Sequence, residues 1–99
     1  MIQPSSNANV PTIQTSTTAL ADSAGRRIAW NIQNLGQNVL YVLLGTGASS
    51  TVFHVALKAA TSNDDGTGGT VGQESGVIFT GVISVAGTSP RYTVLEQIN

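Results

Sequence analysis

Short segments of alternating side chains, separated by turn residues, most constrain the fold of this chain. In the clearest of them, Ile28, Trp30 and Ile32 lie in phase, while Arg27 and Asn31 fall on the opposite, solvated face. No stretch repeats apolar residues with a helical period over three turns, so no substantial helix is predicted. Strands are expected at residues 12–20, 27–33, 39–44, 51–57, 77–85 and 91–98. The sequence therefore predicts an all-β fold, a small single-domain β-sandwich or barrel of about six antiparallel strands.

The single tryptophan has two interpretations. Trp30 shares its predicted face with Ile28 and Ile32, so we expect it to be the largest side chain of the core. In the alternative, Trp30, Tyr41 and Tyr92 form an exposed aromatic face that stacks against a carbohydrate. The phase of the alternation favours the core.

The segment at residues 39–44 is apolar on both faces. We expect it to be a central strand, joined to the strand at 27–33 as a hairpin through the glycine-containing connection 34–38. One face would contact the core, and the other needs a cover, which another subunit would provide. Leu40, Val42 and Leu44 are therefore predicted to be residues of an assembly interface.

Two further segments stand out from the strands. Residues 1–11 are polar and contain two prolines, so they predict an extended N-terminal arm before a domain that spans residues 12–99. Ile2 and Val10 are its only branched apolar residues, and we expect them to insert into a groove of a neighbouring subunit. Residues 58–76 are glycine-rich and predict a loop that is long for a compact domain.

Charge is scarce in this chain of 99 residues and 10.2 kDa. Charged residues make up 9% of the sequence and the formal net charge is -1, whereas about 25% is usual in soluble domains. A basic surface for nucleic acid is therefore excluded, and the longest apolar run is too short to cross a membrane. The segment at 1–9 has neither the basic nor the apolar stretch of a secretory signal, and the chain has no cysteine. Low charge and a doubly apolar strand favour association, so we expect a homo-oligomer, with a trimer favoured.

Residues that could carry catalysis are few. His54 is the only histidine, and its position between Phe53 and Val55 is typical of a packing or interface residue. No nucleophile has a general base at a recognisable spacing. The sequence therefore predicts neither an enzyme nor a bound cofactor.

One motif matches the ligand spacing of a calcium-binding loop in outline. Asn63, Asp65 and Thr67 alternate, and Glu74 stands in twelfth place. The first position is Asn instead of Asp, and no helical pattern flanks the motif, so the oxygens are not aimed at one ion. We interpret the motif, with Asp64, as a solvated turn and predict no metal site.

Several segments together resemble small virion proteins of tailed bacteriophages, and the similarity runs from about residue 26 to residue 96. These segments are 32–42, 44–49, 64–69, 80–87 and 90–92. The resemblance implies a β-rich structural subunit of the particle, of the capsid decoration or cement type. Such a protein binds the outer capsid surface and stabilises contacts between capsid subunits.

The expected partners are the major capsid protein and further copies of the chain, without nucleic acid or membrane. The expected location is the virion surface, after synthesis in the cytoplasm of the bacterial host. The alternative is a structural or host-glycan-binding module of a phage tail or fibre.

Overall fold

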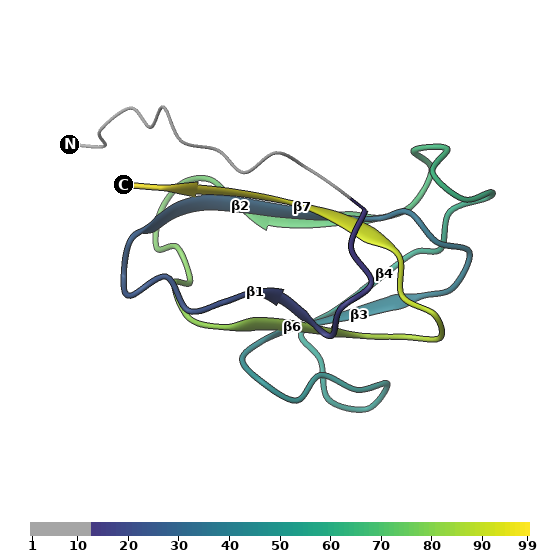
Figure 1. The fold of residues 1–99 in the computed structure, drawn as a ribbon, viewed down its shortest axis with the longest axis horizontal. Coiled ribbons are helices and arrows are strands. Elements are labelled where there is room, and N and C mark those ends of the chain that lie inside the picture. The colour runs from purple at the N-terminus through teal and green to yellow at the C-terminus, as the bar shows by residue number, and fades with distance from the viewer. Residues whose placement is uncertain (1–12) are drawn as a thin grey trace.

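The computed structural model describes residues 13–99, which form seven strands and no helix. Two antiparallel sheets pack face to face (Figure 1), so the predicted all-β class is confirmed and the chain is a sandwich. One sheet has the strand order β1-β6-β3-β4, and the other has the order β5-β2-β7. The strands are β1 (Thr18–Leu20), β2 (Arg27–Asn34), β3 (Leu40–Leu44), β4 (Val55–Leu57), β5 (Thr70–Gln73), β6 (Ile83–Ala86) and β7 (Tyr92–Ile98). The predicted arm, with Ile2 and Val10, lies outside the described residues.

The three-stranded sheet is built around β2, whose alternation sets its buried face. Trp30 and Ile32 are 3% and 0% exposed and face the other sheet, beside Tyr92 and Val94 of β7. The indole Nε1 of Trp30 donates to Gln73 Oε1 at 2.8 Å, so its polar atom has a partner inside the fold. Trp30 is therefore a core residue, as predicted.

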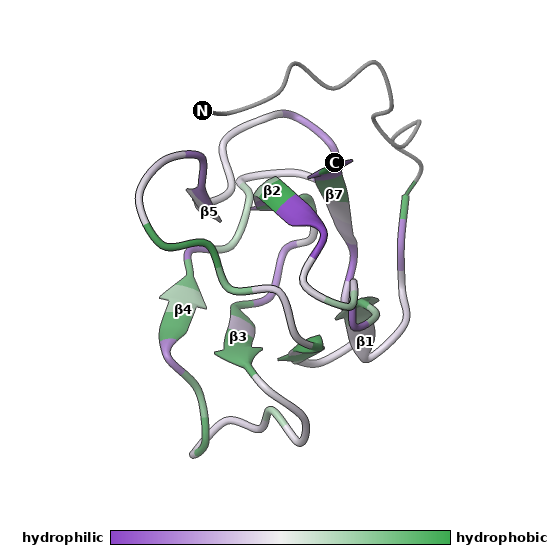
Figure 2. Ribbon diagram, turned by 90° about the vertical axis from the view of Figure 1, so that its left-hand side faces the viewer, coloured by the Kyte–Doolittle hydropathy of each residue, from purple (hydrophilic) through white to green (hydrophobic). Residues whose placement is uncertain are grey.

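Aliphatic side chains of the four-stranded sheet form the other half of the core. Each such side chain, once fully buried, stabilises the fold by about 1.5–3 kcal/mol. Figure 2 shows the hydrophobic character of β3 and β4, which contribute to this layer. The buried aliphatic residues of this sheet are Leu20, Leu40, Val42, Leu57, Ile83 and Val85.

The predicted hairpin between residues 27–33 and 39–44 is wrong, because β2 and β3 lie in different sheets. The chain crosses between the layers in an arch at residues 34–39. Asn34 is 1% exposed and holds this arch together. Its Nδ2 donates to the carbonyls of Asn38 at 2.8 Å and Lys58 at 3.1 Å, and its Oδ1 accepts from the Gly36 N–H at 3.0 Å. A buried amide needs both donors and acceptors, and the backbone of an arch supplies them.

Several strand boundaries also differ from the prediction. The segments at 13–17, 51–54 and 77–82 form no regular strand, although Gln14 makes a single bridge to Tyr92. The expected loop at 58–76 contains β5, which pairs with β2. A Cβ at Gly72 would overlap the carbonyl oxygen of Trp30, so the lack of a side chain allows β5 to approach β2.

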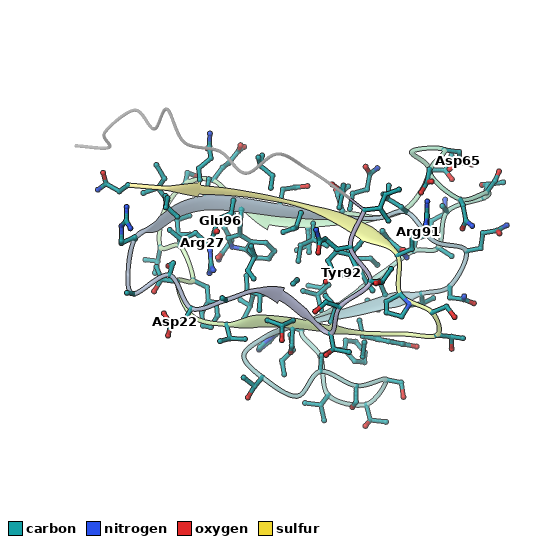
Figure 3. All side chains as sticks on the ribbon, viewed as in Figure 1. Asp22, Arg27, Asp65, Arg91, Tyr92 and Glu96 are labelled. Carbon is teal, nitrogen blue, oxygen red and sulfur yellow. The ribbon has the colours of Figure 1, made fainter. Side chains whose placement is uncertain are left out.

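Arg27 is buried, although the alternation placed it on the solvated face. A bulge after Arg27 shifts the register of β2 against β7 and turns this side chain between the sheets (Figure 3). Its guanidinium donates to Glu96 Oε2 at 2.9 Å, to the carbonyls of Phe79 and Gly81 at 2.9 Å each, and to the carbonyl of Ala21 at 2.8 Å. One side chain thereby joins two loops to the last strand of the sheet.

Candidate interaction surface

The four-stranded sheet carries no charged side chain. Residues 28–57 contain no Asp, Glu, Lys or Arg, and the same holds for residues 75–90. Together these two segments provide β3, β4 and β6, and the short strand β1 is also uncharged. The outer face of this sheet can therefore be dehydrated without the large cost of removing a charge from water.

Four side chains on β3, just before it and in the loop that follows it are exposed or partly exposed, and we call them the apolar patch: Val39, Tyr41, Val52 and Phe53. Tyr41 points outward because its neighbours in β3, Leu40 and Val42, point into the core. The rings of Tyr41 and Phe53 lie 4.9 Å apart between centroids. Val39, Phe53 and Val52 are 40%, 40% and 51% exposed. The patch thus presents two valines and two aromatic rings to solvent.

The loop between β3 and β4 forms one side of the patch and folds back over the sheet. Figure 1 shows this loop beneath β6 and β3. The Ala48 N–H donates to Ser84 Oγ at 3.1 Å, and the Leu44 N–H donates to His54 Nδ1 at 3.0 Å. Within the loop, the Ser49 N–H donates to the Val52 carbonyl at 2.9 Å. These bonds fix the loop against the sheet.

A shallow groove runs beside the patch along β3 and β6. Its lining is uncharged and consists of small hydroxyl, amide and apolar groups. A Cβ at Gly87 would lie 2.7 Å from the carbonyl oxygen of Val39, so a glycine lets the two segments come together here. The residues that line the groove include Asn38, Val39, Tyr41, Ala48, Ser49 and Gly87.

The predicted interface residues of this strand require a correction. Leu40 and Val42 are each 1% exposed and belong to the core, so neither side chain is available to a partner. Leu44 is half-buried and packs against the core. The other face of the strand does need a cover, and the chain's own loop at 45–54 provides part of it. Tyr41, Leu43 and Leu44 of β3 are partly exposed, and Val39 just before the strand is 40% exposed. Val39, Tyr41 and Leu43 alternate in the opposite phase to the prediction.

The proposed three-ring carbohydrate platform is not formed. Trp30 is 3% exposed and Tyr92 is 0% exposed, so only Tyr41 of the three rings reaches the surface. The Tyr92 hydroxyl donates to the carbonyl of Ser16 at 2.6 Å. Burial raises the pKa of Tyr92 to about 12.

The carboxylates of the calcium-like motif bind protein groups at separate places. Asp64 forms a two-point ion pair with Arg91, with Nε to Oδ1 at 2.7 Å and Nη2 to Oδ2 at 2.5 Å. This hydrogen bonding lowers the pKa of the Asp64 carboxyl. The carboxylate of Asp65 accepts from the Thr67 hydroxyl and N–H and from the Ser62 N–H, and the bond from the Thr67 hydroxyl is the main cause of its lowered pKa.

Glu74 points to a different surface from these two aspartates. It lines a groove on the outer side of the three-stranded sheet with Leu95 and Gln97. Within residues 13–99, no group of three His, Asp or Glu side chains is arranged to hold a metal ion.

Sequence reasoning missed the exposed side chains at 52 and 53. The alternation placed Phe53 in phase with Val55 and Leu57, but the regular strand begins only at Val55. Residues 51–54 instead leave the sheet, and Phe53 turns outward against Tyr41. The absence of charged residues from 28 to 57 was the sequence signal for an uncharged face, since so long a stretch without charge is unusual in a protein surface.

No family model, curated protein or solved structure matches the chain. Within residues 13–99, no helix is long and apolar enough to span a membrane.

Proposed function

We propose that the chain is a structural protein of a bacteriophage virion, a capsid decoration protein that binds the outer surface of the shell. Its partners are the major capsid protein and further copies of itself, and it stabilises contacts between capsid subunits. The observation that carries the proposal is an uncharged sheet face with a preorganised apolar patch. A surface of this kind suits a protein that acts by adhering to others.

The segments that resemble small virion proteins support the same proposal by their positions in the fold. Residues 32–42 form the end of β2, the arch and most of β3. Residues 80–87 include β6, which pairs with β3. The resemblance therefore covers the arch and the patch residues Val39 and Tyr41, but neither Val52 nor Phe53.

The arrangement of polar groups also fits a protein that must stay rigid on a particle. The buried side chains of Arg27 and Asn34 tie loops and both sheets together through hydrogen bonds. Among the described residues, no buried side-chain nitrogen or oxygen lacks a hydrogen-bond partner. Fully satisfied buried polar groups make the interior rigid and specify one arrangement.

A tail or fibre module that binds host glycan is the competing proposal. Its remaining support is the Tyr41 and Phe53 pair beside the hydroxyl and amide groups of the groove. Aromatic rings next to such groups are also common at protein interfaces.

Particles from a phage strain that lacks the gene for this chain provide the test. Purified chain is added to these heads, and the bound fraction is measured after sedimentation through sucrose at moderate salt. We expect saturable binding to the heads and increased resistance of the shell to heat. Binding at the tail alone, or recovery in the pellet no greater than without heads, would contradict the proposal.

A further inference from the structure

We propose that His54 is a pH-sensitive contact that holds the loop between β3 and β4 against the sheet. The contact, which we call the His54 latch, is the hydrogen bond from the Leu44 N–H to Nδ1 of the imidazole ring at 3.0 Å. The neutral ring closes the latch, and uptake of a proton opens it. The inference goes beyond the proposed function, because it concerns the chain alone and requires no partner.

The latch lies where the backbone pairing of β3 with β4 ends. Val42 and Val55 are the last residue pair of the two strands at this end. Beyond that pair, the His54 N–H donates to the Val42 carbonyl at 2.8 Å, and the ring of the same residue accepts from the Leu44 N–H. A side chain therefore continues the contact between the strands after the backbone ladder has ended.

The geometry of this bond determines the protonation state of the ring. A backbone N–H can only donate, so the nitrogen that faces Leu44 carries a lone pair and the ring hydrogen lies on Nε2. A second proton can bind only to Nδ1, because Nε2 already carries one. The closed latch would then place two donors face to face, so the bond is lost when the ring is charged.

The space beside the ring offers no other partner to a charged imidazole. Apolar side chains of β2, β3, β4 and β5 line this space, together with Gly72 and Gln73. The side-chain oxygen of Gln73 already accepts from Trp30 Nε1 at 2.8 Å and from the Phe79 N–H at 2.9 Å. His54 itself is exposed, so the charged ring can turn into water instead of staying beside apolar groups.

The charged and titratable groups of the surrounding strands act elsewhere. Glu74 follows β5 but lines the groove on the outer side of that sheet, and Lys58 follows the far end of β4. On β2, Arg27 is bound to Glu96. Tyr41 is the titratable residue of β3, and a phenol does not change its charge between pH 8 and pH 5. An imidazole does change its charge in this range, so His54 is the group through which pH acts on the loop.

The other contacts of the loop contain no titratable group. The Ala48 N–H is bound to Ser84 Oγ, and the Ser49 N–H to the Val52 carbonyl. Residues 45–53 and 75–90 have no titratable side chain. Opening of the latch therefore releases the end of the loop that carries Val52 and Phe53 and leaves its attachment at Ala48 in place.

Nuclear magnetic resonance of the ¹⁵N-labelled full-length chain tests the latch directly. At pH 8, the ¹⁵N shifts of the His54 ring should show a hydrogen on Nε2 and none on Nδ1. Hydrogen exchange, corrected for the intrinsic rate at each pH, gives the protection factor of the Leu44 N–H. We expect this protection factor to fall about three- to tenfold between pH 8 and pH 5, because one hydrogen bond is lost.

His54→Asn is the matched control, because an amide Oδ1 can accept from the Leu44 N–H and does not titrate. Leu44 should keep its protection at both pH values in this variant. In His54→Phe, which keeps a ring without an acceptor, the protection should be low at both. The fluorescence of Trp30 checks that each variant is folded.

Three results would overturn the inference: a ring hydrogen on Nδ1 at pH 8, equal protection of Leu44 at both pH values in wild type, or the same fall in His54→Asn as in wild type. These measurements also stand apart from the head-binding experiment. Failure of the latch leaves the decoration function in place, and a chain that binds no heads leaves the latch in place.

Discussion

Replacement of Arg27 by methionine is the sharpest test of how this sandwich is held together. The guanidinium donates to Glu96 and to three backbone carbonyls, those of Ala21, Phe79 and Gly81. Methionine keeps an unbranched apolar stem of similar length but has no hydrogen-bond donor. Arg27→Met therefore removes all four interactions while it leaves the space between the sheets largely filled.

The expected loss follows from the groups that remain. Each backbone carbonyl left without a donor costs about 1–3 kcal/mol, and the lower end applies because these loops are only partly buried. Three carbonyls give about 3 kcal/mol, and loss of the ion pair adds about 1 kcal/mol, because the Glu96 side chain is 25% exposed and can be hydrated without its partner. Arg27→Met should therefore lower the free energy of unfolding by about 3–5 kcal/mol. A domain of this size has a free energy of unfolding of about 5–15 kcal/mol in total, so the loss is a large share of it.

Urea unfolding followed by the fluorescence of Trp30 measures this loss. Trp30 is the only tryptophan and is 3% exposed, so its emission reports the opening of the core. Arg26→Met is the neighbouring control, because Arg26 is exposed and its side-chain bonds go to the carbonyl of Asn99. The control should cost less than about 1 kcal/mol, and the dependence on urea concentration should stay the same in both variants.

A second variant separates the ion pair from the carbonyl contacts. The side chain of Glu96 is 25% exposed, so it can be hydrated when its partner is lost. Glu96→Gln should therefore cost only about 1 kcal/mol. If Arg27→Met were as stable as wild type, or if Glu96→Gln cost as much as Arg27→Met, the assignment of the stabilisation to the three carbonyls would be wrong.

Three further predictions concern the core, the arch and the loop beside it. Burial raises the pKa of Tyr92 to about 12, so the buried neutral tyrosine stabilises the fold fully below about pH 10, and this stabilisation is lost as the pH rises through 12. Alkaline denaturation curves should show the loss in wild type and not in Tyr92→Phe. At pH 7 that variant should be less stable than wild type by about 1 kcal/mol. A Cβ at Gly68 would overlap the carbonyl oxygen of Asn34, so Gly68→Ala should destabilise the fold by about 1–3 kcal/mol in urea unfolding, and an unchanged midpoint would refute the close contact. The lowered pKa of Asp64 means that its pairing with Arg91 stabilises the fold above about pH 4, and that this stabilisation is lost as the pH falls through the folded-state pKa. Between pH 7 and pH 2, the melting temperature should therefore fall less steeply for Asp64→Asn than for wild type.

The sequence predicted strands best where a single face is buried along a whole segment. Residues 27–33 and 91–98 alternate, and β2 and β7 lie there. β5 was missed because its sequence, Thr-Val-Gly-Gln, is short and contains Gly72. Gly72 is needed in the strand because a side chain there would overlap the carbonyl oxygen of Trp30. No local sequence pattern reveals this contact.

Strand pairing was less predictable than strand position. A short glycine-containing connection between two apolar segments is the usual signal of a hairpin. Here the connection forms an arch between the sheets instead, because the buried amide of Asn34 bonds to backbone groups of the arch and to the carbonyl of Lys58, which is 24 positions later in the chain. A preference that depends on such a distant partner is not readable from residues 34–38 alone.

The uncharged character of the four-stranded sheet was readable from the sequence, but the side chains on its outer face were not. A strand that is apolar on both faces does not say which face is buried, and Leu40 and Val42, which the prediction assigned to an interface, are in the core. The choice depends on which side meets Trp30 and Ile32 across the sandwich. The loop that covers part of the outer face adds Val52 and Phe53, and its path was not evident from alternation.

The pairing of β2 with β7 also sets when the protein can fold. Asn31 lies opposite Leu95, which follows it by 64 positions, and β1 meets β6 across a similar interval. At about 5–20 residues per second, a ribosome needs roughly 3–13 s to make the chain between such partners. During that time β2 has no β7 beside it, and the opposing sheet is incomplete until β6 is made. Domains dominated by distant strand pairs also fold slowly, in milliseconds to seconds. Folding is therefore expected to follow synthesis of β7, and a nascent chain stalled before residue 92 should depend on chaperones to avoid aggregation.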